Sequence, residues 1–372
     1  MVTHTRSHPL LSPSLGTQRQ LVSVHYGREG SSPKAYLQAS LHADELPGML
    51  VLHHLRKLLD RADEAGEVRG EIVLVPLANP IGLAQRVLHE PGGRFELAGG
   101  ENFNRRFPDY YPLVRDAVAP LLTADANANR TVVRAALRDA LAAVAPESEL
   151  ASLRHTLATL ALDSDLVLDL HCDREAVLHL YTDEPFWPAF EPLARDLGVA
   201  LTVLGRGHGG TTFEESCGQA WWRLAHEFGT AVPHGCVSAT VELRGQRDLR
   251  HDQAIKDALA IYAFLQRRGH LAGEAPPLPP PVDAPMHWEG MISITAPQAG
   301  LIVYTRDVGE RVEAGDTIAE IVDPLDNRVV PIVSRIAGML YARHLQRYAQ
   351  PGMELCRVVG DVAVAEAPVV LA

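Results

Sequence analysis

The chain has 372 residues, long enough to bury a sizeable core and to form more than one domain. Its 34 basic and 46 acidic residues give a formal net charge of −12, which disfavours nucleic acid as a partner. No apolar stretch reaches the roughly 18 residues of a membrane span, and the first 20 residues lack the apolar core of a signal peptide. Four cysteines without paired spacing fit a reducing compartment, so we expect a cytoplasmic protein that does not bind membranes.

Apolar runs typical of strands alternate along the chain with stretches of helical periodicity. We expect strands at residues 35–41, 71–77, 165–170, 176–181, 199–204 and 237–243. We expect helices near residues 47–65, 133–161, 187–197, 217–228 and 250–268. This alternation predicts an α/β fold. The alanine-rich stretch 117–162 carries no ligand candidates and indicates one or two helices that serve as scaffold or as a wall of a pocket.

A proline-rich segment divides the chain. Residues 273–285 hold six prolines among thirteen residues, a composition typical of a stiff, extended linker. We therefore expect an N-terminal extension over residues 1–20, a main domain over 21–272 and a second domain over 286–372.

The second domain has an all-β pattern. Residues 299–322 and 336–359 both alternate apolar residues with glycine turns, which suggests two similar halves and resembles the barrel-sandwich fold of lipoyl and biotinyl carriers. Those carriers attach their cofactor to a lysine, but the chain's only lysines, Lys34, Lys57 and Lys256, all precede the linker. A swinging-arm role is excluded, which leaves a lid, specificity or oligomerisation domain.

Two histidines at the ends of predicted strands indicate a metal site. His42 follows the run that ends at residue 41 and stands three residues before Glu45, while His171 closes the apolar run 165–170. A catalytic zinc usually has three nitrogen or oxygen ligands from the protein and one position left to water. His42, Glu45 and His171 are the candidate ligands. A lone histidine is more often solvated or hydrogen-bonded, and Glu45 also fits a first-turn carboxylate of the helix that Pro47 opens.

Two further segments carry a family resemblance. Asn102 to Pro108 puts amide and guanidinium groups together, and Val241-Glu242-Leu243-Arg244-Gly245 ends a β-branched run with a carboxylate. With His-x-Asp-Glu-x-Pro-Gly, Asn79-Pro80 and Asp169-x-His171, the chain from about residue 20 to 361 resembles the succinylglutamate desuccinylase and aspartoacylase family, zinc amidohydrolases related to the M14 carboxypeptidases.

The resemblance implies a carboxypeptidase-like mixed sheet flanked by helices and one zinc ion per chain. It implies that zinc is held by His42, Glu45 and His171, and that Asn104 and Arg105 hold a substrate carboxylate. The arginine motif departs from the family's Asp-Leu-Asn-Arg, since residues 102–105 read Asn-Phe-Asn-Arg. This departure puts substrate specificity in doubt.

Glu242 is the candidate general base. Amide hydrolysis needs a carboxylate that moves a proton from water to the leaving nitrogen, and the family resemblance gives Glu242 that role. Arg244 stands two residues on, so it shares a strand face with Glu242; it either points into the site as a substrate ligand or forms a salt bridge with Glu242. Arg94 is the family-based candidate for polarising the scissile carbonyl, with Arg86 as its rival. Asp169 is expected to support His171 from outside the ligand set.

The roles of several residues near the pocket stay undecided. A tyrosine from the C-terminal domain enters the site in aspartoacylases, and Tyr304, Tyr341 and Tyr348 are available. The glycine-rich segment 207–212 has no phosphate-binding lysine and indicates a flexible loop over the pocket, from which His208 and Glu214 contact substrate. No His-Glu-x-x-His helix and no nucleophile elbow is present in the sequence.

The sequence therefore predicts a zinc-dependent hydrolase that cleaves the amide bond of an N-acyl amino acid or a similar small carboxylate-bearing substrate. A metallocarboxypeptidase acting on short peptides is the alternative enzyme. A non-catalytic binding module is the alternative of another class. The sequence names neither the acyl group nor the amino acid, and it leaves self-association open.

Overall fold

The computed structural model describes residues 4–207 and 211–361, whose centre is a nine-stranded mixed sheet. In spatial order its strands are β1 (His4–Pro9), β2 (Gln20–Gly27), β4 (Glu71–Val75), β3 (Lys34–Ala39), β7 (Leu166–Asp173), β11 (Val237–Gly245), β9 (Leu178–Asp183), β10 (Leu201–Gly205) and β12 (Met286–His287). The six expected strands are all present. Strands β1, β2 and β12 were not expected, and β1 places part of the N-terminal extension at the sheet edge, antiparallel to β2.

The middle of this sheet positions the functional residues. Strands β3, β7 and β11 run parallel and are almost wholly buried, as expected for continuous apolar runs covered on both faces. His171 of β7 pairs in register with Glu242 of β11. The chain leaves β3 at the same edge and enters the segment that carries His42. The carboxyl ends of three neighbouring strands therefore meet at one place.

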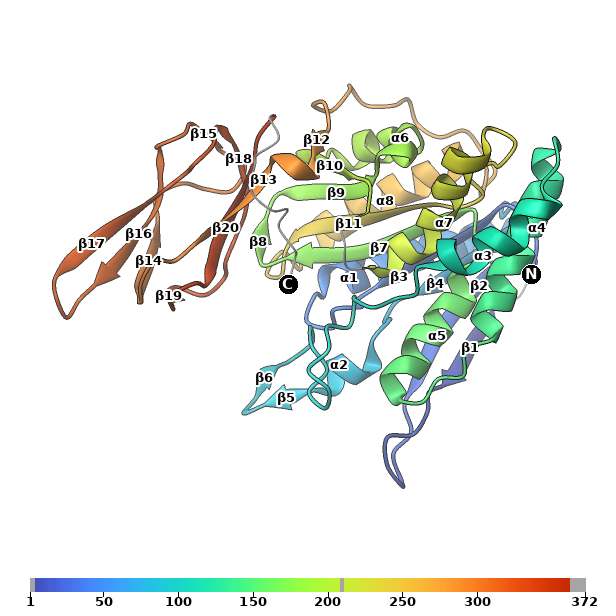
Figure 1. Ribbon diagram of the computed structural model, residues 1–372, viewed down its shortest axis with the longest axis horizontal. Coiled ribbons are helices and arrows are strands. Elements are labelled where there is room, and N and C mark those ends of the chain that lie inside the picture. Colours follow the sequence, from blue (N-terminus) through green and yellow to red (C-terminus); the bar gives the residue numbers. More distant parts are fainter. Residues whose placement is uncertain (1–3, 208–210, 362–372) are drawn as a thin grey trace.

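Helices cover both faces of the sheet (Figure 1). One face is covered by α1 (Pro47–Glu64), α6 (Trp187–Leu197) and α8 (His251–Arg267). The other face is covered by α3 (Tyr110–Val118), α4 (Ala126–Ala142), α5 (Glu149–Ala161) and α7 (Phe213–Phe228). The alanine-rich stretch thus contains two helices, α4 and α5. None of the described helices is both long and apolar enough to cross a membrane.

Helix α7 begins four residues before the expected start at 217. Glu215, at its third position, accepts a hydrogen bond from the backbone N–H of Thr212, which is half of a capping box. The small elements α2 (Pro80–Ala84), β5 (Arg86–Val87) and β6 (Glu90–Pro91) lie between β4 and α3 in the chain. The 3-10 turns are η1 (Ala119–Leu121), η2 (Glu184–Phe186) and η3 (Trp288–Gly290).

The C-terminal domain is all β. One sheet contains β13 (Met291–Thr295), β20 (Glu354–Val359), β18 (Gly338–Arg343) and β15 (Arg311–Val312). The other contains β17 (Arg328–Val333), β16 (Thr317–Asp323), β14 (Gly300–Tyr304) and β19 (Tyr348–Ala349). Side chains of both sheets form one apolar core. Each of the two expected halves contains three strands, of which the middle one has only two residues. The likeness to lipoyl carriers stays a prediction.

The two domains are joined by more than the proline-rich segment, which forms no helix or strand between residues 273 and 285. Strand β8 (Glu175–Ala176) of the main domain pairs with β18, so the second domain lies beside the end of β7 (Figure 1). A separate apolar cluster packs Tyr181 and Val203 against Trp288 and Tyr341. The C-terminal domain is therefore held close to the carboxyl end of β7.

Candidate metal centre and active site

His42 and Glu45 lie in a short loop between β3 and α1 that is fixed from three sides. The Ser40 hydroxyl donates to the Glu45 carbonyl (2.7 Å), and the Asn79 side-chain amide donates to the Leu41 carbonyl (2.8 Å). The Ala43 N–H donates to the carbonyl of Gly93 (2.9 Å). A Cβ atom at Gly93 would lie 2.2 Å from the backbone nitrogen of Asp44, so only glycine allows this approach. Glu45 itself precedes the first turn of α1.

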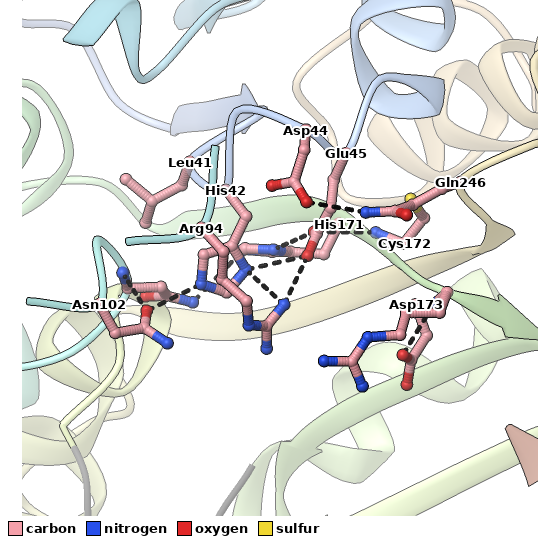
Figure 2. Close-up of polar contacts among 12 residues, drawn as sticks. Leu41, His42, Asp44, Glu45, Arg94, Asn102, His171, Cys172, Asp173 and Gln246 are labelled. Atoms are coloured by element: carbon pink, nitrogen blue, oxygen red, sulfur yellow. Dashed lines mark hydrogen bonds and ion pairs between the residues drawn. The ribbon is translucent and has the colours of Figure 1, made fainter. Parts of the chain in front are cut away.

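His42, Glu45 and His171 form a compact buried cluster. The Nδ1 atom of His42 lies 2.9 Å from Oε1 of Glu45, and the Nδ1 atom of His171 lies 2.8 Å from Oε2. Each side chain offers one ligand atom, and these atoms all lie within 4.8 Å of one another. Figure 2 shows both imidazoles converging on the carboxylate. The sequence-predicted ligand set is therefore brought together, and it could hold one metal ion.

Both imidazoles are held from behind by an oxygen acceptor. Nε2 of His42 lies 2.9 Å from Oδ1 of Asn102, and Nε2 of His171 lies 3.0 Å from Oδ2 of Asp169. The acceptor Asn102 favours the proton on Nε2 of His42, and the negative charge of Asp169 favours it on Nε2 of His171, although the Asn104 amide nitrogen also lies 3.4 Å from that atom. A proton on Nε2 leaves the Nδ1 lone pair directed at the cluster centre, which is the arrangement that a bound metal requires. The supporting position of Asp169 agrees with the expectation. Asn102 was missed, although it begins the arginine motif.

The cluster is electrostatically matched to a cation. Burial acts to raise the pKa of Glu45, but the rings of His42 and His171 outweigh it and hold the pKa well below its usual range. Burial is also the main factor that lowers the pKa of His42, with Arg94 adding to it, so this ring is kept neutral. A carboxylate and a neutral imidazole are the protonation states in which Glu45 and His42 would bind metal. Burial lowers the pKa of His171, but the charges of Asp169 and Glu45 outweigh it and hold the pKa well above its usual value, so that ring would release a proton when a metal binds.

Glu242 lines the same cavity as the cluster. Its Oε2 atom is buried and has no hydrogen-bond partner among residues 4–207 and 211–361. Burial raises the pKa of Glu242 to about 8, and the nearby charge of Glu45 contributes in the same direction. A divalent cation at the cluster would act in the opposite sense and favour the ionised form. No salt bridge joins Glu242 to Arg244 in the described structure.

Arg94 and the loop of Asn104 and Arg105 form another wall of the cavity. Arg94 donates from Nη1 to Oε1 of Glu45 at 2.9 Å (Figure 2). Its rival Arg86 is exposed and donates to the backbone carbonyl of His89, so it does not line the cavity. The side-chain oxygen of Asn104 accepts from the backbone N–H of Phe213 (2.8 Å), and its amide nitrogen lies 3.4 Å from Nε2 of His171.

Arg244 does not enter the site, contrary to the expectation. The pairing of β11 with β7 shifts register between Glu242 and Gly245, and Arg244 takes a left-handed backbone conformation with φ of 65°. This irregularity breaks the alternation of side chains along the strand. The guanidinium instead forms two hydrogen bonds with Asp257 of α8, at 2.8 and 3.1 Å.

The C-terminal domain contributes an arginine and a tryptophan to the cavity, not a tyrosine. Arg357 of β20 and Trp288 line it, together with Tyr181 of β9. Arg357 donates to Oδ2 of Asp173 at 2.8 Å, two residues beyond the candidate ligand His171. Among the expected tyrosines, Tyr341 is buried beside Tyr181, Tyr304 lies against two arginines and Tyr348 is exposed; none lines the cavity. His208 lies outside the described residues.

Comparison with known proteins gives one family. The model of the succinylglutamate desuccinylase/aspartoacylase catalytic domain matches residues 31–268. A comparison with curated proteins found no match. Among solved structures, a succinylglutamate desuccinylase/aspartoacylase family protein from Shewanella amazonensis is 26% identical, with a TM-score of 0.84 over 96% of this chain and 98% of that chain. One from Shewanella frigidimarina has the same identity and TM-score, over 96% and 97%.

More distant structures share the fold. The product-bound ectoine utilization protein EutE (DoeB) from Ruegeria pomeroyi is 18% identical, with a TM-score of 0.65 over 97% of this chain and 95% of that chain. The family match covers well over half of the chain and includes the whole metal cluster together with Arg94 and Glu242. The chain therefore belongs to the succinylglutamate desuccinylase/aspartoacylase family of hydrolases.

Proposed function

We propose that this protein is a zinc-dependent hydrolase that cleaves the amide bond of an N-acyl amino acid. The observation that carries the proposal is the buried cluster of His42, Glu45 and His171, whose three ligand atoms lie within 4.8 Å, beside the unpartnered carboxyl of Glu242. Two imidazoles and one carboxylate form a standard set for catalytic zinc, which leaves a position for water. The outer acceptors Asn102 and Asp169 support the same assignment.

Zinc at this cluster supplies a Lewis acid and a water of lowered pKa. Glu242 accepts a proton from the attacking water at its buried Oε2 atom and delivers it to the nitrogen of the leaving amine. The bond between the carbonyl carbon and that nitrogen breaks, and the products are a carboxylic acid and an amine. Arg94, which already donates to Glu45, is placed to stabilise negative charge on the carbonyl oxygen.

Arg105 and the amide nitrogen of Asn104 are the proposed binding groups for the substrate carboxylate. A guanidinium offers a planar pair of donors that matches a carboxylate. The cavity encloses about 70 Å³, and Arg357 and Trp288 of the C-terminal domain form part of its wall. A small central cavity walled in part by a second domain favours a small N-acyl amino acid over an extended peptide.

The deciding experiment replaces Glu242 by glutamine. Glu242→Gln keeps the shape of the side chain, so we expect normal zinc content and a loss of hydrolysis of at least roughly two orders of magnitude. Activity is measured on a panel of N-acyl amino acids and on short peptides. Asp44→Asn is the matched control, because Asp44 lies beside Glu45 but accepts from Gln246 (2.9 Å) outside the central cavity.

Near-normal turnover of Glu242→Gln, or an equal loss in Asp44→Asn, would contradict the assignment of Glu242 as general base. Faster cleavage of peptides than of N-acyl amino acids would establish a carboxypeptidase instead. A protein that binds these ligands and zinc but hydrolyses none of them would be a binding module.

A further inference from the structure

Three histidines meet at the surface between α1 and α8, away from the central cavity. His53 and His54 are consecutive residues of α1, and His251 is the first residue of α8. Nε2 of His54 lies 3.0 Å from Nδ1 of His251. The ring of His54 stands edge-on to both other rings, with centroids 5.2 Å apart in each pair. None of the three lines the central cavity, so the proposed hydrolysis does not use them.

The two helices hold His54 and His251 in place. Both helices pack on the same face of the main sheet (Figure 1). Leu55, which follows His54, and Ala254 in the first turn of α8 belong to one buried apolar cluster. The imidazoles lie at the surface of this packed pair, His54 half-buried and His251 exposed. A ligand pair fixed by a core loses little conformational freedom when it binds an ion.

The distance between the two nitrogen atoms suits a single metal ion. A divalent metal binds imidazole nitrogen at about 2.0 to 2.1 Å. Two ligands at that radius lie about 2.9 Å apart at a right angle and about 3.3 Å apart at the tetrahedral angle. The observed 3.0 Å between Nε2 of His54 and Nδ1 of His251 matches the right angle of a square-planar or tetragonal ion. Each ring needs only to turn until its lone pair faces the shared ion.

The number of protein ligands favours copper. Among the described residues, three metal-binding side chains come within 4.8 Å of one another only at the central cluster, so the surface site has two. Zinc usually takes at least three protein ligands. Cu²⁺ binds a given nitrogen site more tightly than the other divalent first-row metals do, and its tetragonal geometry leaves positions for water. A site of two histidines therefore favours Cu²⁺ over Zn²⁺.

The charge state of His54 also suits a metal ligand. Partial burial is the largest cause that lowers the pKa of His54, and the charges of Lys57, His53 and His251 add to it. The imidazole is therefore neutral near pH 7, as a metal ligand must be. Lys57 also repels a metal ion, but its side chain is exposed, so solvent and salt screen that repulsion.

We propose that His54 and His251 form a second metal site, which binds one Cu²⁺ ion between α1 and α8. The ion is held by Nε2 of His54 and Nδ1 of His251, and water fills its remaining positions. The proton that now lies between these two nitrogens moves to the outer nitrogen of its own ring. This site is independent of the central cluster and of the proposed hydrolysis.

An ion at this site ties together two helices that lie behind the central cavity. Helix α1 begins two residues after Glu45, and α8 holds Asp257, which binds Arg244 at the end of β11. The unfolded chain does not keep the two imidazoles together, so the ion binds the folded state preferentially. At free Cu²⁺ a hundredfold above the dissociation constant, the equilibrium constant of unfolding should fall about a hundredfold.

The experiment titrates the zinc-loaded protein with Cu²⁺ near neutral pH and counts both metals after dialysis. The terminal amine is acetylated first, because a free amine is itself a copper ligand. We expect the zinc content to stay constant while about one Cu²⁺ per chain binds. The electron paramagnetic resonance spectrum of that copper should show coupling to two nitrogen nuclei, since zinc is silent in this measurement.

His54→Gln and His251→Gln test the two ligands. Each variant should weaken Cu²⁺ binding at least roughly tenfold and abolish the rise in denaturant midpoint that copper causes. Both side chains lie at the surface, so equal midpoints without copper are expected and show that the variants are folded. His53→Gln is the matched control, because His53 adjoins His54 on α1 and contacts its ring. Its copper affinity should stay within about threefold of wild type.

The proposal is overturned if copper binds only by displacing zinc, or if His54→Gln and His251→Gln bind it as tightly as wild type. It is also overturned if His53→Gln loses as much affinity as these two variants, because surface histidines would then bind copper without a defined pair. Equal affinity of the site for Zn²⁺ and Cu²⁺ would indicate a third protein ligand and contradict the site of two histidines.

Discussion

Replacing Asp169 by asparagine tests whether the group behind a ligand controls the metal affinity. The carboxylate of Asp169 has two neighbours: Gln38 donates to its Oδ1 at 3.0 Å, and Nε2 of His171 forms an ion pair with its Oδ2 at 3.0 Å. The introduced asparagine has only one oxygen, so one donor must face its amide group. Gln38 cannot easily turn over, because its own oxygen accepts from the Tyr36 hydroxyl at 2.8 Å. We therefore expect His171 to lose its ion-pair partner.

The expected cost follows from this lost bond. Removing the partner of a metal-bound imidazole typically weakens metal affinity by about tenfold to a hundredfold, or about 1.4 to 2.7 kcal/mol. The expected fall in zinc affinity agrees with the electrostatics of the site. Burial lowers the pKa of His171, but the charges of Asp169 and Glu45 outweigh it and hold the pKa well above its usual value. Without the charge of Asp169 the imidazole is a weaker base and a weaker metal ligand.

The assay is a competition titration of zinc between the protein and a chromophoric chelator at constant pH. Asn102→Asp is the control at His42, because it adds a negative charge behind that imidazole where Asp169→Asn removes one behind His171. Oδ1 of Asn102 accepts from His42 and from the backbone N–H of Asn104 at 2.9 Å, while its amide nitrogen has no partner among the described residues. Exchanging that nitrogen for oxygen costs no hydrogen bond, so zinc affinity should stay equal or rise.

Zinc affinity of Asp169→Asn within about threefold of wild type would refute this reasoning, provided that the variant unfolds at a similar denaturant concentration. A fall in Asn102→Asp as large as that in Asp169→Asn would show that any change at these positions disturbs the loop. The charge on the imidazole would then not be the cause.

Three further predictions follow from the same contacts. His42→Ala or His171→Ala should abolish both zinc and hydrolysis, and full zinc occupancy by metal analysis in either variant would remove that residue from the ligand set. Arg105→Lys should lower kcat/KM by about tenfold to a hundredfold for a free-carboxylate substrate and far less for its amide; equal losses would remove the carboxylate role. Arg244→Met should lower the free energy of unfolding by about 2 kcal/mol, since it leaves the buried carboxyl group of Asp257 without its arginine, and should change kcat/KM less than about threefold. A tenfold loss of kcat/KM with unchanged stability would return Arg244 to the site.

The candidate ligand residues could be found in the sequence because each of their signals is local. His42 and His171 both follow apolar runs, and such runs form the buried parallel strands of an α/β sheet. Neighbouring parallel strands end at the same edge of the sheet. The meeting of the two histidines can therefore be predicted even when the conformations of the loops are not known. Glu242 follows the same rule, because β11 is the next strand and pairs it with His171.

Residues whose role depends on irregular backbone could not be predicted in this way. Arg244 was placed by assuming regular alternation, and the register shift before Gly245 removes that assumption. The glycine was a signal for a bulge, but its effect on Arg244 depends on Asp257, thirteen residues away on α8. Asn102 was visible in its motif, yet its contact with His42 depends on the loop that Gly93 brings close.

The C-terminal contribution was the least predictable, because it depends on how two domains pack. The composition of residues 286–372 indicates a β domain but not which of its side chains reaches the main domain. The structure places Arg357 there through Asp173, the last residue of β7. Asp173 in turn raises the pKa of Glu242, for which burial is the main cause, so the arginine that neutralises Asp173 also limits the charge around the general base. The second domain therefore forms part of the cavity wall, and a chain that ended at the linker would leave Asp173 without its arginine beside Glu242, the proposed general base.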